Sequence, residues 1–464
     1  MSQNFENSII KLEQLKALEK LHKIIGKSIP IVNNLALSTF GVKIQENNVV
    51  GLSLNRCGLT KFPEPIFGLK KLQELHLGYN LLTTLPNFLN DLIYLEKLNL
   101  RMNFINNLPE SFGELISLKV LILDSNKLST LPEYFGNLNS LEELSIRDNQ
   151  IRKLPFSFSS LKSLKELYLS KNKITIFPEA ISDLKTLEGL YLDNNNLKNL
   201  SNKISNLTSL YTLNLSKNSL TMLTDEIINP LIELKSLRTL DLNHNQLKSL
   251  PEVFGKLTNL KILRLRKNQL NRLPESFNQL ESLESLDLSN NKFIKFPESL
   301  LELSALQRLY FESNELTTLP EQIDNLLSLQ QLNLENNSIK FLPESFSNLK
   351  LLKQLYLVNN QLISLPESFG NLNSLQMLDL RNNKLISLPH SFGNLQMLQE
   401  LDLRNNQFIS IPIPIWRLIN LRDNYIKLDG NPFNIQSKRM ISRNIYAIRE
   451  YCRRRYELRS PLKK

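Results

Sequence analysis

The chain repeats one pattern about every 23 residues, and this period constrains the fold more than any other feature. The clearest copy spans residues 375–395 and reads LQMLDLRNNKLISLPHSFGNL. An asparagine marks each copy, with Cys57 in the slot before the first and Asn431 in the slot after the last, which makes 17 slots. A repeat of this length predicts a solenoid, in which each unit buries its apolar face only against its neighbours. The marker asparagines are Asn80, Asn103, Asn126, Asn149, Asn172, Asn195, Asn218, Asn245, Asn268, Asn291, Asn314, Asn337, Asn360, Asn383 and Asn406.

Each position of the repeat has a physical interpretation. Leu378 and Leu380 alternate with polar residues, which is typical of a strand with one buried face. Asn383 follows this strand, and stacked copies of it predict a hydrogen-bonded asparagine ladder. Pro389 suits the first position of a short helical turn on the outer side. A column of large apolar residues nine places after the marker predicts a packed spine: Phe112, Phe135, Phe158, Phe254, Phe277, Phe346, Phe369 and Phe392, with Ile181, Leu300 and Ile323 as variants.

The consensus LxxLxLxxNxLxxLPxxFxxLxxL resembles the leucine-rich repeat family over residues 49–431. More narrowly, the LPxxFxxLxxL form is similar to intracellular Ras-group leucine-rich repeat proteins. The resemblance implies an α/β fold: a right-handed solenoid, or horseshoe, with about 17 parallel strands on its concave face and short helical turns on its convex face. It also implies a protein partner, with a small GTPase or a phosphatase complex as candidates.

The array needs polar caps over its first and last layers. We expect residues 1–48 to form an N-terminal capping helix and a hairpin, residues 49–431 the repeat array, and residues 432–464 a C-terminal capping helix and a basic tail. Apolar spacing predicts the first helix within residues 8–25. Ser437 is the predicted cap of the last helix. Its predicted buried face is Ile441, Ile445, Ile448 and Cys452.

One spacing is irregular, since Asn218 and Asn245 are 27 residues apart. The extra residues predict a longer outer helix. Two interpretations stay open: tolerated variation on the outer face, or a hinge or partner contact.

The net charge of +11 is concentrated at the C-terminus. Residues 436–464 hold ten Lys and Arg against two Glu, a net of +8, so the other residues carry +3. The tail is either a solubilising cap or a weak contact for an anionic surface, whereas the near-neutral body argues against nucleic acid. We expect its charges on or beyond the solvent side of the capping helix: Arg449, Arg453, Arg454, Arg455, Arg459, Lys463 and Lys464.

Composition favours a cytoplasmic, monomeric protein. Cys57 and Cys452 are the only cysteines, and no cysteine-rich flank accompanies them, so a reducing compartment is expected. No apolar run approaches the roughly 20 residues that cross a bilayer. The four histidines lie far apart in the repeats, and no spacing suggests a catalytic set. We therefore expect no metal, no cofactor and no enzymatic activity.

The information for binding should lie in the outward residues of the strands. Three clusters emerge: stacked tyrosines at 168 and 191, a mixed block around Arg264, and a repeated Asp–Arg pair. Tyr and Arg favour a protein partner, while the alternative is a solvated, self-neutralising charge ladder. The predicted protein-binding residues are Tyr168, Tyr191, Asp241, Arg264, Arg266, Asp287, Arg308, Tyr310, Tyr356, Asp379, Arg381, Asp402 and Arg404.

The leading hypothesis is therefore a non-enzymatic scaffold that binds a folded partner on its concave face, in small-GTPase signalling. The alternative is a regulatory repeat subunit of a Roco-like GTPase, or of another enzyme, whose catalytic part is supplied in trans. Gly430-Asn431-Pro432 followed by a helix resembles the junction in such multidomain GTPases.

Overall fold

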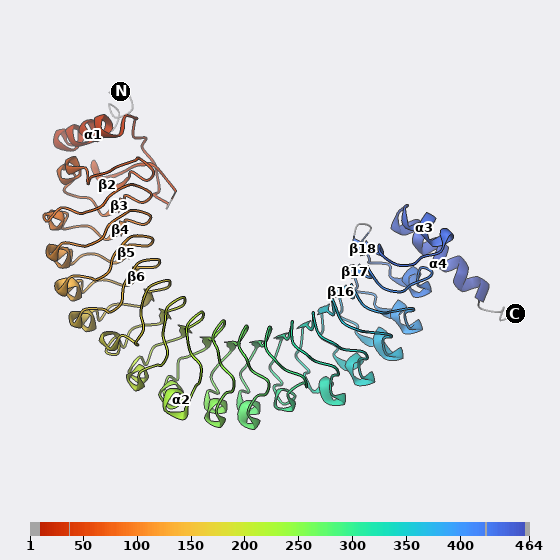
Figure 1. Cartoon of the computed structure of the whole chain (residues 1–464). Coiled ribbons are helices and arrows are strands. Elements are labelled where there is room, and N and C mark those ends of the chain that lie inside the picture. Colours follow the sequence, from red (N-terminus) through yellow and green to blue (C-terminus); the bar gives the residue numbers. More distant parts are fainter. Residues whose placement is uncertain (1–9, 37, 423–424, 460–464) are drawn as a thin grey trace. The chain divides into compact units, whose positions relative to one another are not determined.

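The computed structural model describes residues 10–36, 38–422 and 425–459. The chain divides into two compact units. The N-terminal unit comprises Met1–Leu220 and Asn229–Leu237, and the C-terminal unit comprises Thr221–Ile228 and Arg238–Lys464. Within each unit the strands lie on the concave side and the short helical turns on the convex side (Figure 1).

The N-terminal unit holds nine strands of the open sheet. β1 (Gly41–Gln45) and β2 (Asn48–Ser53) form the predicted hairpin. From β2 onward each strand pairs in parallel with the strand of the next repeat. These strands are β3 (Glu74–His76), β4 (Lys97–Asn99), β5 (Val120–Ile122), β6 (Glu143–Ser145), β7 (Glu166–Tyr168), β8 (Gly189–Tyr191) and β9 (Thr212–Asn214).

The C-terminal unit continues the same pattern with nine parallel strands. The prediction of about 17 parallel strands is confirmed, and β1 adds an antiparallel eighteenth. The strands are β10 (Thr239–Asp241), β11 (Ile262–Arg264), β12 (Ser285–Asp287), β13 (Arg308–Tyr310), β14 (Gln331–Asn333), β15 (Gln354–Tyr356), β16 (Met377–Asp379), β17 (Glu400–Asp402) and β18 (Ile426–Lys427).

The outer turns are 3₁₀-helices, and the irregular spacing carries the expected longer helix, α2 (Asp225–Ile232). In most turns the motif proline immediately precedes the helix instead of opening it: Pro389 is extended, with ψ 155°. The turns are η2 (Glu64–Gly68), η3 (Leu89–Asp91), η4 (Glu110–Glu114), η5 (Glu133–Asn137), η6 (Phe156–Ser160), η7 (Glu179–Ile181), η8 (Asn202–Asn206), η9 (Glu252–Lys256), η10 (Glu275–Gln279), η11 (Glu298–Leu300), η12 (Glu321–Asn325), η13 (Glu344–Asn348), η14 (Glu367–Asn371), η15 (His390–Asn394) and η16 (Ile413–Arg417).

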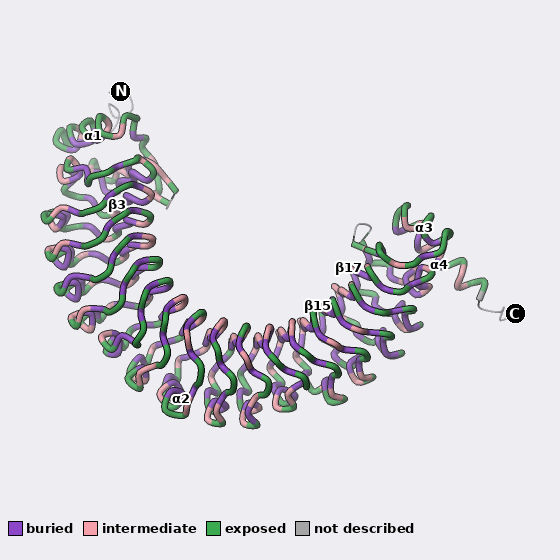
Figure 2. Tube along the Cα trace, in the orientation of Figure 1, coloured by how far each residue is buried: buried purple, intermediate pink, exposed green. Residues whose placement is uncertain are grey.

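The core lies between the strands and the outer turns, as the buried stretches in Figure 2 show. Leu378 and Leu380 are buried as predicted. The phenylalanine column forms a stacked spine, with ring centroids of Phe112 and Phe135 6.2 Å apart and those of Phe135 and Phe158 6.0 Å apart. Offset aromatic stacks of this kind add to the stabilisation that comes from burial alone.

Within each unit the marker asparagines form the predicted ladder, in which the side chain from one repeat also bonds the backbone of the preceding repeat. The Oδ1 atom of Asn103 accepts from the Leu82 amide at 3.0 Å. Its Nδ2 group donates to the Leu77 carbonyl at 3.0 Å and to the Leu100 carbonyl at 2.9 Å. Buried backbone groups of the turn are thereby paired, which avoids a cost of about 1–3 kcal/mol for each group.

The residue before each marker adopts a left-handed conformation, which the sequence analysis did not foresee. Its φ is between 51° and 57° in every repeat from Arg56 to Asn405. Glycine occupies this position only at the last slot, where Gly430 has φ 73°. Elsewhere the position holds Tyr79, Met102, Ser125, Asp148, Lys171, Asn194, Lys217, His244, Lys267, Asn290, Ser313, Asn336, Asn359 and Asn382.

Helices close both ends of the described chain, but the prediction of a single C-terminal helix was wrong. The N-terminal helix is α1 (Leu12–Ile25). The C-terminal stretch is two helices, α3 (Ile435–Ile441) and α4 (Ile445–Arg459), instead of one. Asn434 caps α3 by accepting from the Ser437 amide, so the predicted cap was one turn too late. Asn444 accepts from the Ala447 amide at the start of α4, which explains the break.

The prediction that the tail arginines face solvent was wrong for two of them. Arg449 donates to the carbonyls of Leu418 and Leu421. Arg455 donates to the Ile411 carbonyl at 3.2 Å. Arg453 and Arg454 are exposed and pair with Glu450. The side chains of Arg459, Lys463 and Lys464 lie outside the described part. The last layer of the array thus presents backbone carbonyl groups, and α4 supplies them with arginine donors.

Candidate functional site

The predicted binding residues all lie on or directly after the strands. The register places Tyr168 opposite Tyr191, Asp241 opposite Arg264, and Asp379 opposite Asp402. Neighbouring strands in a sheet are about 4.8 Å apart, so these side chains are in direct contact range. We consider the two units separately.

The tyrosine cluster of the N-terminal unit forms as predicted. The rings of Tyr168 and Tyr191 stack at 4.5 Å between centroids, with 20° between their planes. The Arg147 guanidinium, which the prediction omitted, lies 4.0 Å from the Tyr168 ring centre. Burial and the negative charge of Glu166 raise the pKa of the Tyr191 hydroxyl. Both tyrosines therefore stay neutral, and they form a rigid stack with the Arg147 cation over the Tyr168 ring.

Glu166 is the member of this cluster whose side chain is incompletely hydrogen-bonded. Burial is the main cause that raises the pKa of its carboxyl group. Its Oε2 atom has no hydrogen-bond partner within the described residues. On the next strand, an added Cβ at Gly189 would lie 2.0 Å from this Oε2, so the carboxylate occupies space that only glycine leaves open. A half-buried carboxylate that is incompletely hydrogen-bonded costs free energy in the folded state.

In the C-terminal unit the basic block is mostly neutralised. Arg264 lies 3.7 Å from Asp241 and remains 43% exposed. Arg266 pairs with Glu312 at 3.0 Å, a partner two repeats away that the prediction missed. Among the described residues Arg308 forms no ion pair. Arg264 and Arg308 are thus the cations of this block with the most freedom to bind another molecule.

Two more predicted residues are partly engaged within this face. The Asp287 carboxylate accepts from the Ser289 amide at 2.9 Å. The Tyr310 hydroxyl donates to Gln331 at 3.2 Å. Such bonds fix the orientation of side chains that point away from the core.

The repeated Asp–Arg pair is a closed network. Arg381 contacts Asp379 at 2.9 Å and Asp402 at 3.5 Å, and Arg404 contacts Asp402 at 2.6 Å. The hydrogen bonds that the two guanidinium groups donate to these carboxylates raise the pKa of both arginines. Each carboxylate also accepts from the amide of its own arginine. These contacts match the alternative interpretation of a self-neutralising charge ladder.

Tyr356 lies beside this network, and its hydroxyl group is already hydrogen-bonded within the protein. Its hydroxyl donates to the Met377 sulfur at 3.0 Å. Burial, together with the charge of Glu335, raises its pKa. Its ring contributes contact area on the inner face but has no hydroxyl proton left for a partner.

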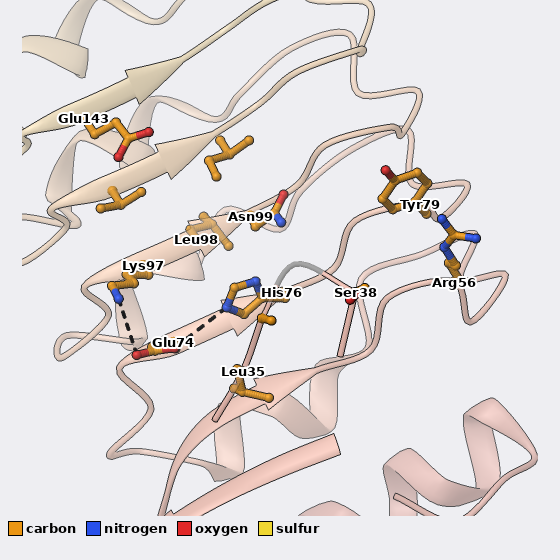
Figure 3. A pocket seen from close by; sticks show the side chains of 13 residues that line it. Leu35, Ser38, Arg56, Glu74, His76, Tyr79, Lys97, Leu98, Asn99 and Glu143 are labelled. Carbon is orange, nitrogen blue, oxygen red and sulfur yellow. Dashed lines mark ion pairs between the residues drawn. The ribbon is translucent and has the colours of Figure 1, made fainter. Parts of the chain in front are cut away.

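The sequence analysis missed a cavity at the N-terminal end of the inner face (Figure 3). Its volume is about 710 Å³, and its floor spans β3 to β6. His76 and Asn99 are buried in its wall. Both belong to the outward column of the strands. Neither was selected as a binding residue, because the sequence analysis chose tyrosines and charged side chains. Their importance depends on the segment before β1, which forms the rim, and no repeat pattern predicts that segment.

Two further searches concern chemistry and membranes. No group of three or more His, Cys, Asp or Glu side chains is arranged to hold a metal ion in the described part of the chain. Likewise, none of the described helices has both the length and the apolar character that a membrane crossing requires.

Comparisons with known families agree with this architecture. A leucine-rich repeat region model matches residues 103–221, 190–310 and 219–335. Two further leucine-rich repeat models match residues 365–408, and residues 328–349 and 351–372. The chain belongs to the leucine-rich repeat family.

Solved structures resemble the chain over most of its length. A leucine-rich repeat protein of Leptospira interrogans is 35% identical, with a TM-score of 0.73, and the match covers 89% of this chain and 96% of that one. The Arabidopsis receptor kinase HAESA, in complex with the peptide hormone IDA and a co-receptor, is 30% identical with a TM-score of 0.65, over 91% of this chain and 72% of that one.

A plant peptide hormone receptor, RGFR1, in complex with RGF2 is 27% identical with a TM-score of 0.63, over 84% of this chain and 68% of that one. A search among curated proteins returned no match. The repeat scaffold of this family is typical of proteins that bind other proteins.

Proposed function

We propose that this protein is a non-enzymatic scaffold that binds a folded protein partner on the inner face of its strands. The observation that carries the proposal is the stacked pair of Tyr168 and Tyr191 with Arg147 over the Tyr168 ring. Rigid aromatic and arginine side chains supply most of the energy at protein interfaces. The complexes of two similar plant receptors with peptide hormones support a polypeptide ligand.

The contacts also rank the predicted residues. Arg381 and Arg404 are already paired with carboxylates, so breaking their pairs to bind a partner would cost what the new contacts gain. Arg264 is largely exposed, and its distance to Asp241 is too long for a hydrogen bond. We therefore propose the tyrosine pair and the block around Arg264 and Arg308 as the main contact residues.

The test is a charge reversal of the basic block. Protein with Arg264→Glu, Arg266→Glu and Arg308→Glu is compared with the wild type by capture of cross-linked partners from native lysate. A control with Lys248→Glu, Arg272→Glu and Lys295→Glu makes the same change in charge at exposed sites of the same unit that lie off the strands. We expect the main partner to be lost only from the first variant, because a hot-spot substitution costs about 2 kcal/mol or more. Equal retention by both variants would place the interface elsewhere.

The partner class that we propose rests on the resemblance to Ras-group repeats. It is a small GTPase or a phosphatase complex, met in the cytoplasm, where the two free cysteines would stay reduced. A panel of purified small GTPases in both nucleotide states tests this directly. If the protein is instead a regulatory subunit of a Roco-like GTPase, adding it should change the hydrolysis rate of that GTPase.

A further inference from the structure

We propose that the cavity at the N-terminal end of the inner face binds the side-chain amide of an asparagine or glutamine in a partner polypeptide. This inference deepens the proposed function and rests on it, because it assumes that the inner face receives a polypeptide. It names a second contact region, entirely within the N-terminal unit, and the chemistry that it selects.

The cavity is a built feature of the fold. Its rim is formed by Leu35, Ala36 and Ser38, ahead of β1. The Leu35 side chain packs over Gly51 on β2, where an added Cβ would lie 2.6 Å from the leucine Cδ1. Thr39 holds the rim as a turn, since it exchanges hydrogen bonds of 3.0 Å with Ala36. These contacts place the described rim residues Leu35 and Ala36 beside the strands.

Two buried polar side chains in the wall lack partners. His76 is 7% exposed and Asn99 is 2% exposed. Within the described residues, neither ring nitrogen of His76 has a hydrogen-bond partner. The Nδ2 group of Asn99 also has none there. The Asn99 Oδ1 atom, in contrast, accepts from the Arg101 amide at 3.0 Å, which fixes the side-chain orientation. Unpaired buried groups cost about 1–3 kcal/mol each, and a bound ligand would recover this energy.

The charges around the cavity balance. Lys97 and Arg56 are matched by Glu74 and Glu143 among the lining residues. Glu74 already pairs with Lys97 at 3.6 Å, and its other oxygen lies 3.9 Å from His76 (Figure 3). Burial lowers the pKa of His76, so its ring is neutral at neutral pH. A balanced site favours an uncharged ligand over a carboxylate or an ammonium group.

A primary amide fits the remaining groups. Its carbonyl oxygen would accept from the Asn99 Nδ2 group and from the N–H of neutral His76. Its NH₂ group would donate to the Glu143 carboxylate, which is also among the lining residues. The apolar lining residues Leu35, Val120 and Ile122 suit the methylene groups of an Asn or Gln side chain. The volume of about 710 Å³ also leaves room for neighbouring residues of the ligand chain, and it lies within the usual range of about 300–1,000 Å³ for binding pockets.

The test selects ligands without assuming their sequence. A display library of random linear peptides is panned on the whole protein and counter-panned on Asn99→Asp, which keeps the Oδ1 acceptor but removes the donor. Asn214→Asp is the matched control, because its Nδ2 group already donates to Asp193 at 3.2 Å. We expect the selected peptides to share an Asn or Gln. They should bind Asn99→Asp about tenfold more weakly or worse, and Asn214→Asp as well as the wild type.

A second measurement needs no variant. Ring-nitrogen shifts of His76 in the wild-type protein should change on addition of a selected peptide, and should not change when its Asn or Gln is replaced by Asp, Glu or Lys. The proposal is overturned if selected peptides share a charged residue instead, if Asn99→Asp binds them equally, or if panning enriches nothing. None of these outcomes affects the capture test on Arg264, Arg266 and Arg308, which belong to the other unit, so the two proposals fail separately.

Discussion

At the scale of single residues, the left-handed position before each marker asparagine is the least expected feature. Residues other than glycine rarely adopt this conformation, which costs about 1–3 kcal/mol, and β-branched residues tolerate it worst. Here it recurs in every repeat, and Asn, Lys and Ser occupy it most often, with no Val, Ile or Thr. The hydrogen bonds between the side chain of the marker asparagine and nearby backbone groups hold the turn in place and offset this cost.

The first prediction follows from this turn. Met102, at φ 54°, should not tolerate a β-branched side chain, so Met102→Val should lower the free energy of unfolding by about 1–2 kcal/mol. Met102→Gly should be neutral or stabilising, because glycine adopts the conformation without strain. Met222→Val is the control, since Met222 is also exposed and its φ is not positive. Thermal unfolding of the variants measures the difference; similar losses for Met102→Val and Met222→Val would contradict the argument.

Glu166 gives a prediction of pH dependence. Its pKa is higher in the folded than in the unfolded chain, so the carboxyl group favours folding while it is protonated and this contribution is lost as pH rises. Glu166→Gln should therefore raise the melting temperature at neutral pH, and the difference should shrink as the pH falls through the acidic range in which Glu166 gains its proton. Glu400→Gln, a substitution at the same strand position of a later repeat, serves as the control. A gap between Glu166→Gln and wild type that is constant with pH would show that charge is not the cause.

The sequence predicted which residues point outward but not how they are paired. The tyrosine stack follows from a period of 23 residues, because column neighbours must be adjacent. The pairing of Arg266 with Glu312 does not, since it skips one repeat and depends on side-chain length and rotamer. The cavity around His76 and Asn99 was missed for a similar reason: its rim comes from a segment outside the repeat.

At the scale of elements, the repeat predicted strands and turns well because each has its own periodicity. The C-terminal helices were less accurate. Apolar spacing was correct for Ile445, Ile448 and Cys452, whereas Ile441, the fourth residue of the predicted buried face, ends α3 and is only half-buried. It gave no sign of the break between α3 and α4, which depends on Asn434 and Asn444 competing as caps with Ser437. The assumption that arginines near the terminus face solvent failed for Arg449 and Arg455, because backbone carbonyls of the last layer provide partners for them.

The third prediction concerns the C-terminal cap formed by α4. Arg449→Met should reduce the free energy of unfolding of the C-terminal unit by about 2 kcal/mol, because the carbonyls of Leu418 and Leu421 lose a charged donor. Arg454→Met removes the same charge from a side chain that is 73% exposed and should cost less than about 1 kcal/mol. Hydrogen exchange should show faster opening around η16 only in Arg449→Met. Equal exchange in both variants would mean that α4 adds charge but no stability.

At the scale of the whole molecule, each repeat packs its apolar core only against its immediate neighbours, so stability is approximately a sum over repeats and their interfaces. Deleting residues 337–359 removes one period of 23 residues and joins Asn336 directly to the marker Asn360. We expect the protein to fold with one strand fewer and a modestly lower melting temperature. Deleting residues 337–347 instead breaks the period and should cause loss of cooperative unfolding in the C-terminal unit. Circular dichroism on heating distinguishes the two; a shortened chain that fails to fold in the first case would contradict a neighbour-only scaffold.

The marker asparagines also determine how the protein should respond to force. Because each side chain joins the backbone of its own repeat to that of the preceding repeat, as Asn103 joins Leu100 to Leu77, tension on one end loads one such junction at a time. A repeat that detaches releases 23 residues, which extend to about 80 Å. When force is applied through α4, the chain should lengthen in a series of steps of nearly constant size, because the repeats detach one after another instead of all at once.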